Sequence, residues 1–397
     1  MSQEFLIKSP ALRTGKPGSA SRLELFFDLA YVLVVLELAT TFLHDLSWHG
    51  LGTFVTLYVA LWFSWVGFTL YANRFDTDDV VFRVAKLAAT LAIAGCAASA
   101  SSATSSFSTP FAACFLLGRI ILLLLLARAW RHVHDARPTI TVYLGSTGVS
   151  AALWAVSMGT TGTVRLLIWV AAVAADAAGP ALATRREDRA PLHMEHLPER
   201  FGLLVILVLG EAVGGAATGV HDARWATPSI AIGITGFVIA AALWWNYFDI
   251  TAEHSEQELH EAEDTDPAGH GAATDERHDL FVYGHLPLTA GIVIAGVGIE
   301  DLVLHPDGPL PSAGGWALAC GLVLYLVGTA LILGGTRRTW QAIWPWPTLA
   351  LPIVAAAPLP RHDTALLLIG ALAAVSVGLA VLGTTRRRGQ RQIISSS

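Results

Sequence analysis

Apolar runs of about 20 residues recur along almost the whole chain, and short polar joints separate them. A helix of that length crosses the roughly 30 Å hydrocarbon core of a bilayer and satisfies its own backbone hydrogen bonds. Composition agrees, because 54% of the 397 residues are hydrophobic, 14% are charged and the mean hydropathy is +0.55. The sequence therefore predicts an all-α, polytopic transmembrane helical bundle and excludes an ordinary soluble domain.

We count twelve such runs. The expected spans are 23–43, 49–72, 82–103, 107–128, 139–160, 164–183, 200–220, 227–250, 281–302, 313–333, 341–358 and 363–384. The run at 341–358 is the least regular, because Pro345, Pro347 and Pro352 each lack a backbone donor and would kink or break a helix. A full crossing and a re-entrant segment are both compatible with it.

The distribution of Lys and Arg predicts the orientation. Loops near helix ends carry excess positive charge on the cytoplasmic side. With the N-terminus inside, all 25 Lys and Arg fall on cytoplasmic segments except Arg119, Arg165, Arg224 and Arg361. A miscount by one helix would destroy this alternation, so we expect both termini in the cytoplasm.

The net charge of −6 has a local origin. Residues 253–279 contain ten carboxylates and one arginine, and this like charge predicts a flexible, solvated cytoplasmic loop. The expected organisation is a cytoplasmic N-terminal tail over 1–22, a first six-helix half over 23–190, a second over 191–384 that contains the acidic loop, and a basic C-terminal tail over 385–397.

The two halves resemble each other in sequence. In chain order, "ELFFDLAYVLVVLE" at 24–37 pairs with "ERFGLLVILVLGE" at 199–211, "YANRFD" at 71–76 with "WNYFD" at 245–249, and "LAATLAIAG" at 87–95 with "LTAGIVIAG" at 288–296. We predict a 6+6 tandem repeat. Because six is even, both copies would have the same orientation in the membrane.

Ionisable residues inside the spans are functional candidates, because a charge at bilayer depth costs at least a few kcal/mol and normally faces a protein interior or a wet cavity. On the first span, Glu24 and Asp28 share one face and Glu37 lies on the opposite face, so we expect protein on all sides of this helix. The candidates for intramembrane polar or proton-relay roles are Glu24, Asp28, Glu37, Arg119, Asp176, Arg200, Glu211, His285 and Glu300.

A structural role is the alternative for each of them. Buried ion pairs can simply specify helix register, and residues near helix ends can reach water. We give this explanation equal weight for Glu24, Glu199, Arg200 and Asp301, and we favour function for Asp28, Glu37, Glu211 and Glu300. We also expect Arg119 to pair with Asp28, Glu37, Asp176 or Glu211.

A cytoplasmic acidic cluster follows the second span, where "YANRFDTDD" contains Arg74, Asp76, Asp78 and Asp79. These acids are suitable ligands for Mg²⁺ or Ca²⁺, but the spacing lacks the glycine turn and distal Glu of a calcium loop. A salt-bridge latch to Arg83 and Lys86 is the favoured interpretation.

Other metal and enzyme signatures are weak. "HMEHLPER" contains His193, Glu195 and His196, but Pro198 interrupts the helix that would align them. We find no phosphate-binding glycine loop, nucleophile elbow or HExxH motif. We therefore expect no catalytic residue, no metal and no cofactor.

Several of these segments together resemble the bacterial low-temperature-requirement protein A (LtrA) family. They are "LELFFDLAYVLVVLEL", "YANRFDTDD", "ERFGLLVILVLGEAV", "LWWNYFD" and "YGHLPLTAGIVIAGVGIE". The resemblance implies a multi-pass protein of the bacterial inner membrane and carries no established biochemical activity. The residues that match its motifs are Glu24, Phe27, Asp28, Arg74, Asp76, Asp78, Asp79, Glu199, Arg200, Gly210, Glu211, His285, Pro287 and Glu300, whereas Ala30, Tyr31 and Ala212 depart from them.

Three functions compete at this point. A proton-coupled secondary transporter of a small solute is preferred, because twelve helices, parallel halves and midplane carboxylates suit alternating access. The alternatives are a noncatalytic membrane scaffold or sensor that supports growth at low temperature, and an intramembrane lipid-modifying enzyme. We expect a lipid bilayer and a small molecule or ion as partners, and no nucleic acid.

Overall fold

In the computed structural model of the chain, the described residues are 8–13, 21–76, 78–183, 197–252, 272–308, 312–336, 369–378 and 380–381. Contacts divide the chain into two compact units. The first unit comprises residues 1–41, 49–200 and 263–279, and the second comprises 42–48, 201–262 and 280–397. The change from one unit to the other after Arg200 falls at the start of the seventh predicted span.

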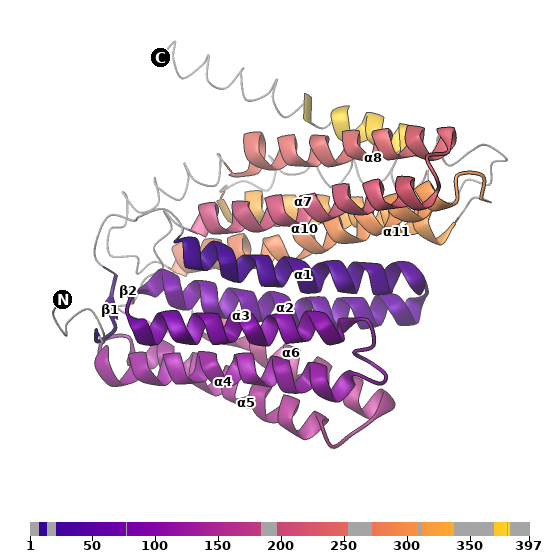
Figure 1. Ribbon diagram of the computed structural model, residues 1–397. Helices are drawn as coiled ribbons and strands as arrows, with labels where there is room; N and C mark the ends of the chain where they lie inside the picture. Colours follow the sequence, from indigo (N-terminus) through magenta and orange to yellow (C-terminus); the bar gives the residue numbers. More distant parts are fainter. Residues whose placement is uncertain are drawn as a thin grey trace, which may run out of the picture. The chain divides into compact units, whose positions relative to one another are not determined.

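Ten helices among the described residues are long and apolar enough to cross a membrane. Each coincides with one of the first ten predicted spans (Figure 1). They are α1 (Arg22–His44), α2 (Trp48–Arg74), α3 (Val80–Ala100), α4 (Ser108–His132), α5 (Arg137–Ser157), α6 (Gly162–Ala183), α7 (Leu197–Asp222), α8 (Thr227–Asn246), α10 (Ala272–Leu304) and α11 (Ala313–Thr336). A short π-helix, η2 (Tyr247–Ala252), continues α8.

The remaining predictions about the C-terminal spans fall largely outside the described residues. The proline-rich run at 341–358 and the basic tail at 385–397 lie outside them, as does the junction at 185–196. Of the twelfth predicted span, a short apolar helix, Ile369–Gly378, is described. The 6+6 repeat and the sidedness of the termini therefore stay predictions.

The structure corrects two expectations about the polar segments, one about the acidic segment 253–279 and one about the N-terminal segment. Helix α10 begins at Ala272, so the last part of the acidic segment 253–279 is helical rather than loop, while 253–271 lies outside the described residues. The N-terminal segment is not simply a tail, because β1 (Ala11–Leu12) pairs antiparallel with β2 (Phe75–Asp76) directly after α2. This pairing occupies backbone groups that the end of α2 leaves unsatisfied.

In the first unit, side chains cap the starts of α1 and α3. The Ser21 hydroxyl accepts from the amide of Glu24, and the Ser21 amide donates to the Glu24 carboxylate, which is a reciprocal capping box for α1. Successive helices α3, α4, α5 and α6 then pack side by side (Figure 1). Aromatic rings join α4, α5 and α6: the ring centroids of Phe115 and Trp154 are 4.3 Å apart, and those of the stacked Trp154 and Trp169 are 4.9 Å apart.

In the second unit, α10 and α11 pack through glycines spaced seven residues apart on each helix. Gly284, Gly291 and Gly298 of α10 face Gly328, Gly321 and Gly314 of α11, so the two helices run antiparallel with their backbones in contact. These two helices are the most buried of the candidate membrane spans: 72% of the apolar segment of α10 and 67% of that of α11 are buried. Small residues allow this close approach, and Cα–H to carbonyl contacts become available between the backbones.

Candidate functional site

Two carboxylates come together in the second unit, Glu211 from α7 and Glu300 from α10. Glu211 and Gly215 are four residues apart and share one face of α7. Glu300 lies against this face, since a methyl group placed on Gly215 would be 2.7 Å from its Oε2 atom. Glu300 also lies within electrostatic range of Glu211.

Helix α7 is shaped to admit the Glu300 side chain. Gly296 packs on Ala212, Glu300 on Gly215 and Val303 on Gly219. Residue numbers rise in the same direction on both helices, so α7 and α10 run parallel. A larger side chain at Gly215 would displace the Glu300 carboxylate. The glycine is therefore part of the site.

Neither carboxylate is neutralised by a nearby lysine or arginine within the described part of the chain. Both are half-buried, and no ion pair or hydrogen bond to either is found there. The other charged neighbours of Glu300 are Asp222, at the exposed end of α7, and His44. The pair thus places two acids close together within two helices that are long and apolar enough to span a membrane.

Two aspartates in the first unit, Asp28 and Asp176, have the opposite environment. Oδ1 of Asp28 accepts hydrogen bonds from Arg200 at 2.9 Å and from the indole N–H of Trp65 at 2.8 Å, and all three side chains are buried. Asp176 accepts from Arg119 at 2.5 Å and from Ser150 at 2.8 Å. The prediction that Arg119 pairs with one of four carboxylates is confirmed, and its partner is Asp176.

Lys86 lies beside the Asp28 and Arg200 pair and makes a different contact from the one predicted. Its side chain is fully buried, with Nζ 3.6 Å from the ring centroid of Phe27 and 5.0 Å from that of Phe68. No hydrogen-bond partner of Nζ is found among the described residues. The expectation that Lys86 joins a surface latch is wrong, because α3 turns this side chain onto the aromatic face of α1 and α2, where cation–π contact partly replaces hydration.

His285 is a buried, hydrogen-bonded residue of α10. Its Nδ1 lies 2.7 Å from the carbonyl oxygen of Phe281, and its Nε2 lies 2.9 Å from the hydroxyl of Tyr247 in η2. The rings of Phe201 and Phe281 pack against it. With both ring nitrogens occupied, His285 positions η2 against α10 in this conformation.

The other two candidates on α1 differ from Asp28. Glu24 serves the capping box with Ser21. Glu37 is half-buried, and its carboxylate makes no hydrogen bond or ion pair to any described residue. Asp28 and Glu37 belong to the first compact unit, whereas Glu211 and Glu300 belong to the second.

The acidic cluster after α2 separates into three ion pairs, each with a different cation. Asp76 pairs with Lys8 at 3.1 Å, Asp78 with Arg83 at 2.8 Å, and Asp79 with Arg128 at 2.5 Å. The latch prediction is right for Arg83 but misses Arg128 and Lys8. Because the three carboxylates turn to different cations, they do not form one cation-binding cluster, and no group of metal-binding side chains is found among the described residues.

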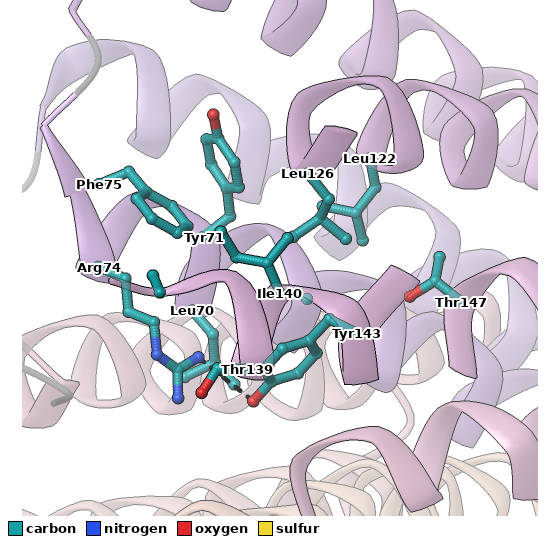
Figure 2. Close-up of a pocket in the computed structure, with 12 residues that line it drawn as sticks. Leu70, Tyr71, Arg74, Phe75, Leu122, Leu126, Thr139, Ile140, Tyr143 and Thr147 are labelled. Carbon is teal, nitrogen blue, oxygen red and sulfur yellow. Dashed lines mark hydrogen bonds between the residues drawn. The ribbon is translucent and has the colours of Figure 1, made fainter. Parts of the chain in front are cut away.

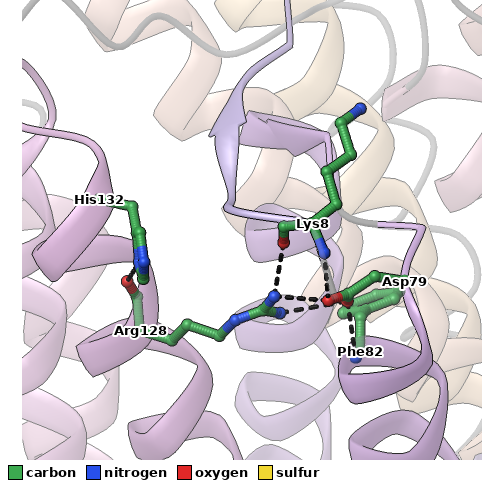
Figure 3. A network of polar contacts seen from close by, with 5 residues as sticks. All are labelled: Lys8, Asp79, Phe82, Arg128 and His132. Carbon is green, nitrogen blue, oxygen red and sulfur yellow. Dashed lines mark hydrogen bonds and ion pairs between the residues drawn. The ribbon is translucent and has the colours of Figure 1, made fainter. Parts of the chain in front are cut away.

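Asp79 is the centre of this latch (Figure 3). It caps α3 by accepting from the amide of Phe82 at 3.0 Å, binds Arg128 of α4 through both carboxylate oxygens, and accepts from the backbone amide of Lys8 at 3.2 Å. Burial acts to raise the pKa of Asp79, but the hydrogen bonds from Arg128 and the two amides outweigh it and lower the pKa. For exposed Asp78, the hydrogen bond from Arg83 lowers the pKa.

The sequence patterns did not single out several interacting residues, namely Lys8, Trp65, Arg128, Tyr143 and Tyr247, and they predicted the wrong contact for Lys86. Arg128 and Lys8 were assigned only to the positively charged cytoplasmic side. One signal was available for Lys86: it lies seven residues after the Asp79 cap of α3, and the residues that follow it in the helix are apolar or small. The partner of each residue depends on which helix faces meet, and spacing along the chain does not determine that.

Known proteins resemble this chain in sequence. The family model of the bacterial low temperature requirement A protein (LtrA) matches residues 19–383, which include every candidate span described above. The chain belongs to the LtrA family. A relative, an uncharacterized protein of Rhizobium meliloti (strain 1021), is 28% identical over 327 residues, covering 78% of this chain and 76% of the relative. No solved structure matches the chain.

Membership in the LtrA family agrees with the helices, and together they describe a multi-pass bacterial membrane protein surrounded by lipid. Asp28, Asp79, Glu211, His285 and Glu300 all lie within the matched region.

Proposed function

We propose that this LtrA protein is a proton-coupled secondary transporter of a small solute in the bacterial inner membrane, with Glu211 and Glu300 carrying the coupled proton. The observation that supports this is the approach of two carboxylates from α7 and α10 without a neutralising lysine or arginine among the described residues. Both termini would be cytoplasmic.

The physical reason is electrostatic. Two carboxylates close together at bilayer depth are costly when both are ionised, and sharing a proton removes one of the charges. Asp28 and Asp176 do not meet this condition, because each is held by an arginine. We therefore assign coupling to the second unit and a structural role to these two aspartates.

Protonation can be linked to movement through the contact of Glu300 with Gly215. When the pair is doubly ionised, repulsion favours separation of the two side chains, and the tight packing of α7 on α10 resists it. Gain or loss of one proton therefore biases the α7–α10 contact. Such a bias is what alternating access requires of a coupling site.

The test uses purified protein in liposomes. Proteoliposomes are placed in a bacterial metabolite extract under an imposed pH gradient, and accumulated solutes are measured by mass spectrometry against protein-free liposomes. We expect accumulation of at least one small solute that a protonophore abolishes. Glu211→Gln and Glu300→Gln should each reduce this accumulation at least tenfold while keeping the wild-type elution profile.

Asp307→Asn is the matched control, because Asp307 is an exposed acid just beyond α10 in the same unit. It should transport like the wild type. Absence of gradient-driven accumulation in the wild type, or full accumulation in both glutamine variants, would refute the proposal.

A noncatalytic scaffold or sensor is the second candidate, and the locked Asp28–Arg200 and Arg119–Asp176 pairs favour it, since such pairs specify helix register. It predicts that deleting residues 256–276 abolishes growth support at low temperature, while the two glutamine variants retain it. Transport predicts the reverse pattern.

A further inference from the structure

Arg74, at the end of α2, is a buried cation for which the described part of the chain supplies no anionic partner. Only 7% of the residue is exposed. The acids that follow it in the chain are already paired, Asp76 with Lys8, Asp78 with Arg83 and Asp79 with Arg128. Arg74 makes no ion pair within the described residues, and its buried Nε has no hydrogen-bond partner there.

The hydrogen bond that Arg74 does make is to a neutral group. Nη1 donates to the hydroxyl of Tyr143 on α5 at 3.2 Å, and the guanidinium lies 5.1 Å from the centroid of the Tyr143 ring. A phenol and a ring face stabilise a cation less than a carboxylate or phosphate does. A buried guanidinium that lacks an anion is costly, so this arrangement calls for a negatively charged ligand.

A partly open cavity of about 20 Å³ lies at this position (Figure 2). Its lining comes from α2, α4 and α5, with Arg74 and Tyr143 close together and Leu70, Leu122 and Ile140 among the apolar residues. This volume admits about one water-sized group, which is the size of a single phosphate oxygen. The cavity therefore takes the tip of an anion and leaves the rest of the ligand outside.

The position of the cavity along the helices indicates which class of anion it would bind. Arg74 ends α2, Leu126 lies in the last two turns of α4, and Thr139 and Tyr143 lie in the first two turns of α5. All three helix segments thus place the cavity at one end of their spans. In a membrane, this is the level of the lipid phosphates, and basic pockets between helices at that level suit anionic headgroups.

We propose that the Arg74–Tyr143 cavity binds a phosphate group, supplied by an anionic phospholipid. Arg74 provides the charge and an Nε–H that no described residue accepts from, Tyr143 provides a hydroxyl, and the acyl chains stay outside the cavity. Inorganic phosphate has the same chemistry and is the other source to be distinguished. This inference does not depend on transport.

The experiment compares lipid binding by matched arginine variants. Wild type, Arg74→Gln and Arg83→Gln are purified in a neutral detergent, titrated with phosphatidylglycerol or phosphatidylcholine, and analysed by native mass spectrometry and thermal unfolding. Arg83 is the control because it lies in the first turn of α3, is exposed, and is already paired with Asp78. Both substitutions remove one positive charge.

We expect tight binding of one phosphatidylglycerol to the wild type and to Arg83→Gln, and at least tenfold weaker binding to Arg74→Gln. Tyr143→Phe keeps the ring and removes the hydroxyl, so it should weaken binding severalfold, and it replaces Arg74→Gln as the test if that variant does not fold. In a parallel arm, inorganic phosphate is compared with chloride at equal ionic strength.

A phosphate-dependent rise in unfolding temperature that requires Arg74 and exceeds the lipid effect would assign the site to free phosphate. Equal phosphatidylglycerol binding by the wild type, Arg74→Gln and Tyr143→Phe, together with no phosphate effect, would overturn the proposal.

Discussion

At the residue scale, five charged or ionisable side chains of this LtrA protein show three different environments. Asp28 and Asp176 are neutralised by arginines, Lys86 lies on aromatic rings, and Glu211 and Glu300 approach each other. Sequence alone assigns the four carboxylates to one class of intramembrane polar residues and Lys86 to the surface. Only the counter-charge distinguishes a register-setting pair from a group that can exchange a proton.

The Asp79 latch gives a prediction at this scale. Asn retains a capping oxygen, so Asp79→Asn removes the charge while keeping the α3 cap, and Asp79→Ala removes both. Loss of the partly buried pair with Arg128 should cost about 1–3 kcal/mol, between the values for exposed and fully buried pairs. The unfolding temperature in detergent measures it.

The pH dependence of the latch follows from the lowered pKa of Asp79. Its stabilising effect is complete above the unfolded-state pKa of about 3.9 and is lost as the pH falls through the lower folded-state value. The difference in unfolding temperature between wild type and Asp79→Asn should therefore be constant from about pH 7 to 5 and shrink as the pH falls below about 4. A difference that grows on acidification would contradict the role of this ion pair.

At the element scale, the glycines of α10 and α11 determine how closely the two helices pack. A methyl group on Gly291 would lie 2.5 Å from the carbonyl oxygen of Gly321 and from the amide nitrogen of Tyr325, so the helices would have to separate. The seven-residue spacing of these glycines is visible in the sequence. The spacing alone does not determine which helix packs against α10.

Gly291→Ala should therefore destabilise the protein, by about 1–3 kcal/mol or more because the obstruction is backbone. Gly214→Ala is the control, since nothing lies within 4 Å of a methyl group there and alanine favours the helix. It should leave the unfolding temperature unchanged or raise it. Similar effects of the two substitutions would show that close α10–α11 packing is not what the glycines provide.

At the scale of the whole molecule, the predicted orientation can be tested on two described loops. In a cysteine-free background, Thr104→Cys lies between α3 and α4, and His134→Cys lies between α4 and α5. Both positions are exposed. We expect a membrane-impermeant maleimide to label Thr104→Cys in intact cells and His134→Cys only after permeabilisation. The opposite pattern would invert the topology.

The sequence by itself determined where the first ten spans lie, because the length and hydropathy needed to cross a bilayer are local properties of a segment. It also located the charged residues within them and the family motifs. It did not determine their partners: Lys86 was assigned to the surface and lies under Phe27, while Arg128 takes Asp79. The tertiary structure decided these pairings, since a buried charge is stabilised by whichever group the facing helix presents, and that helix can be distant in the chain.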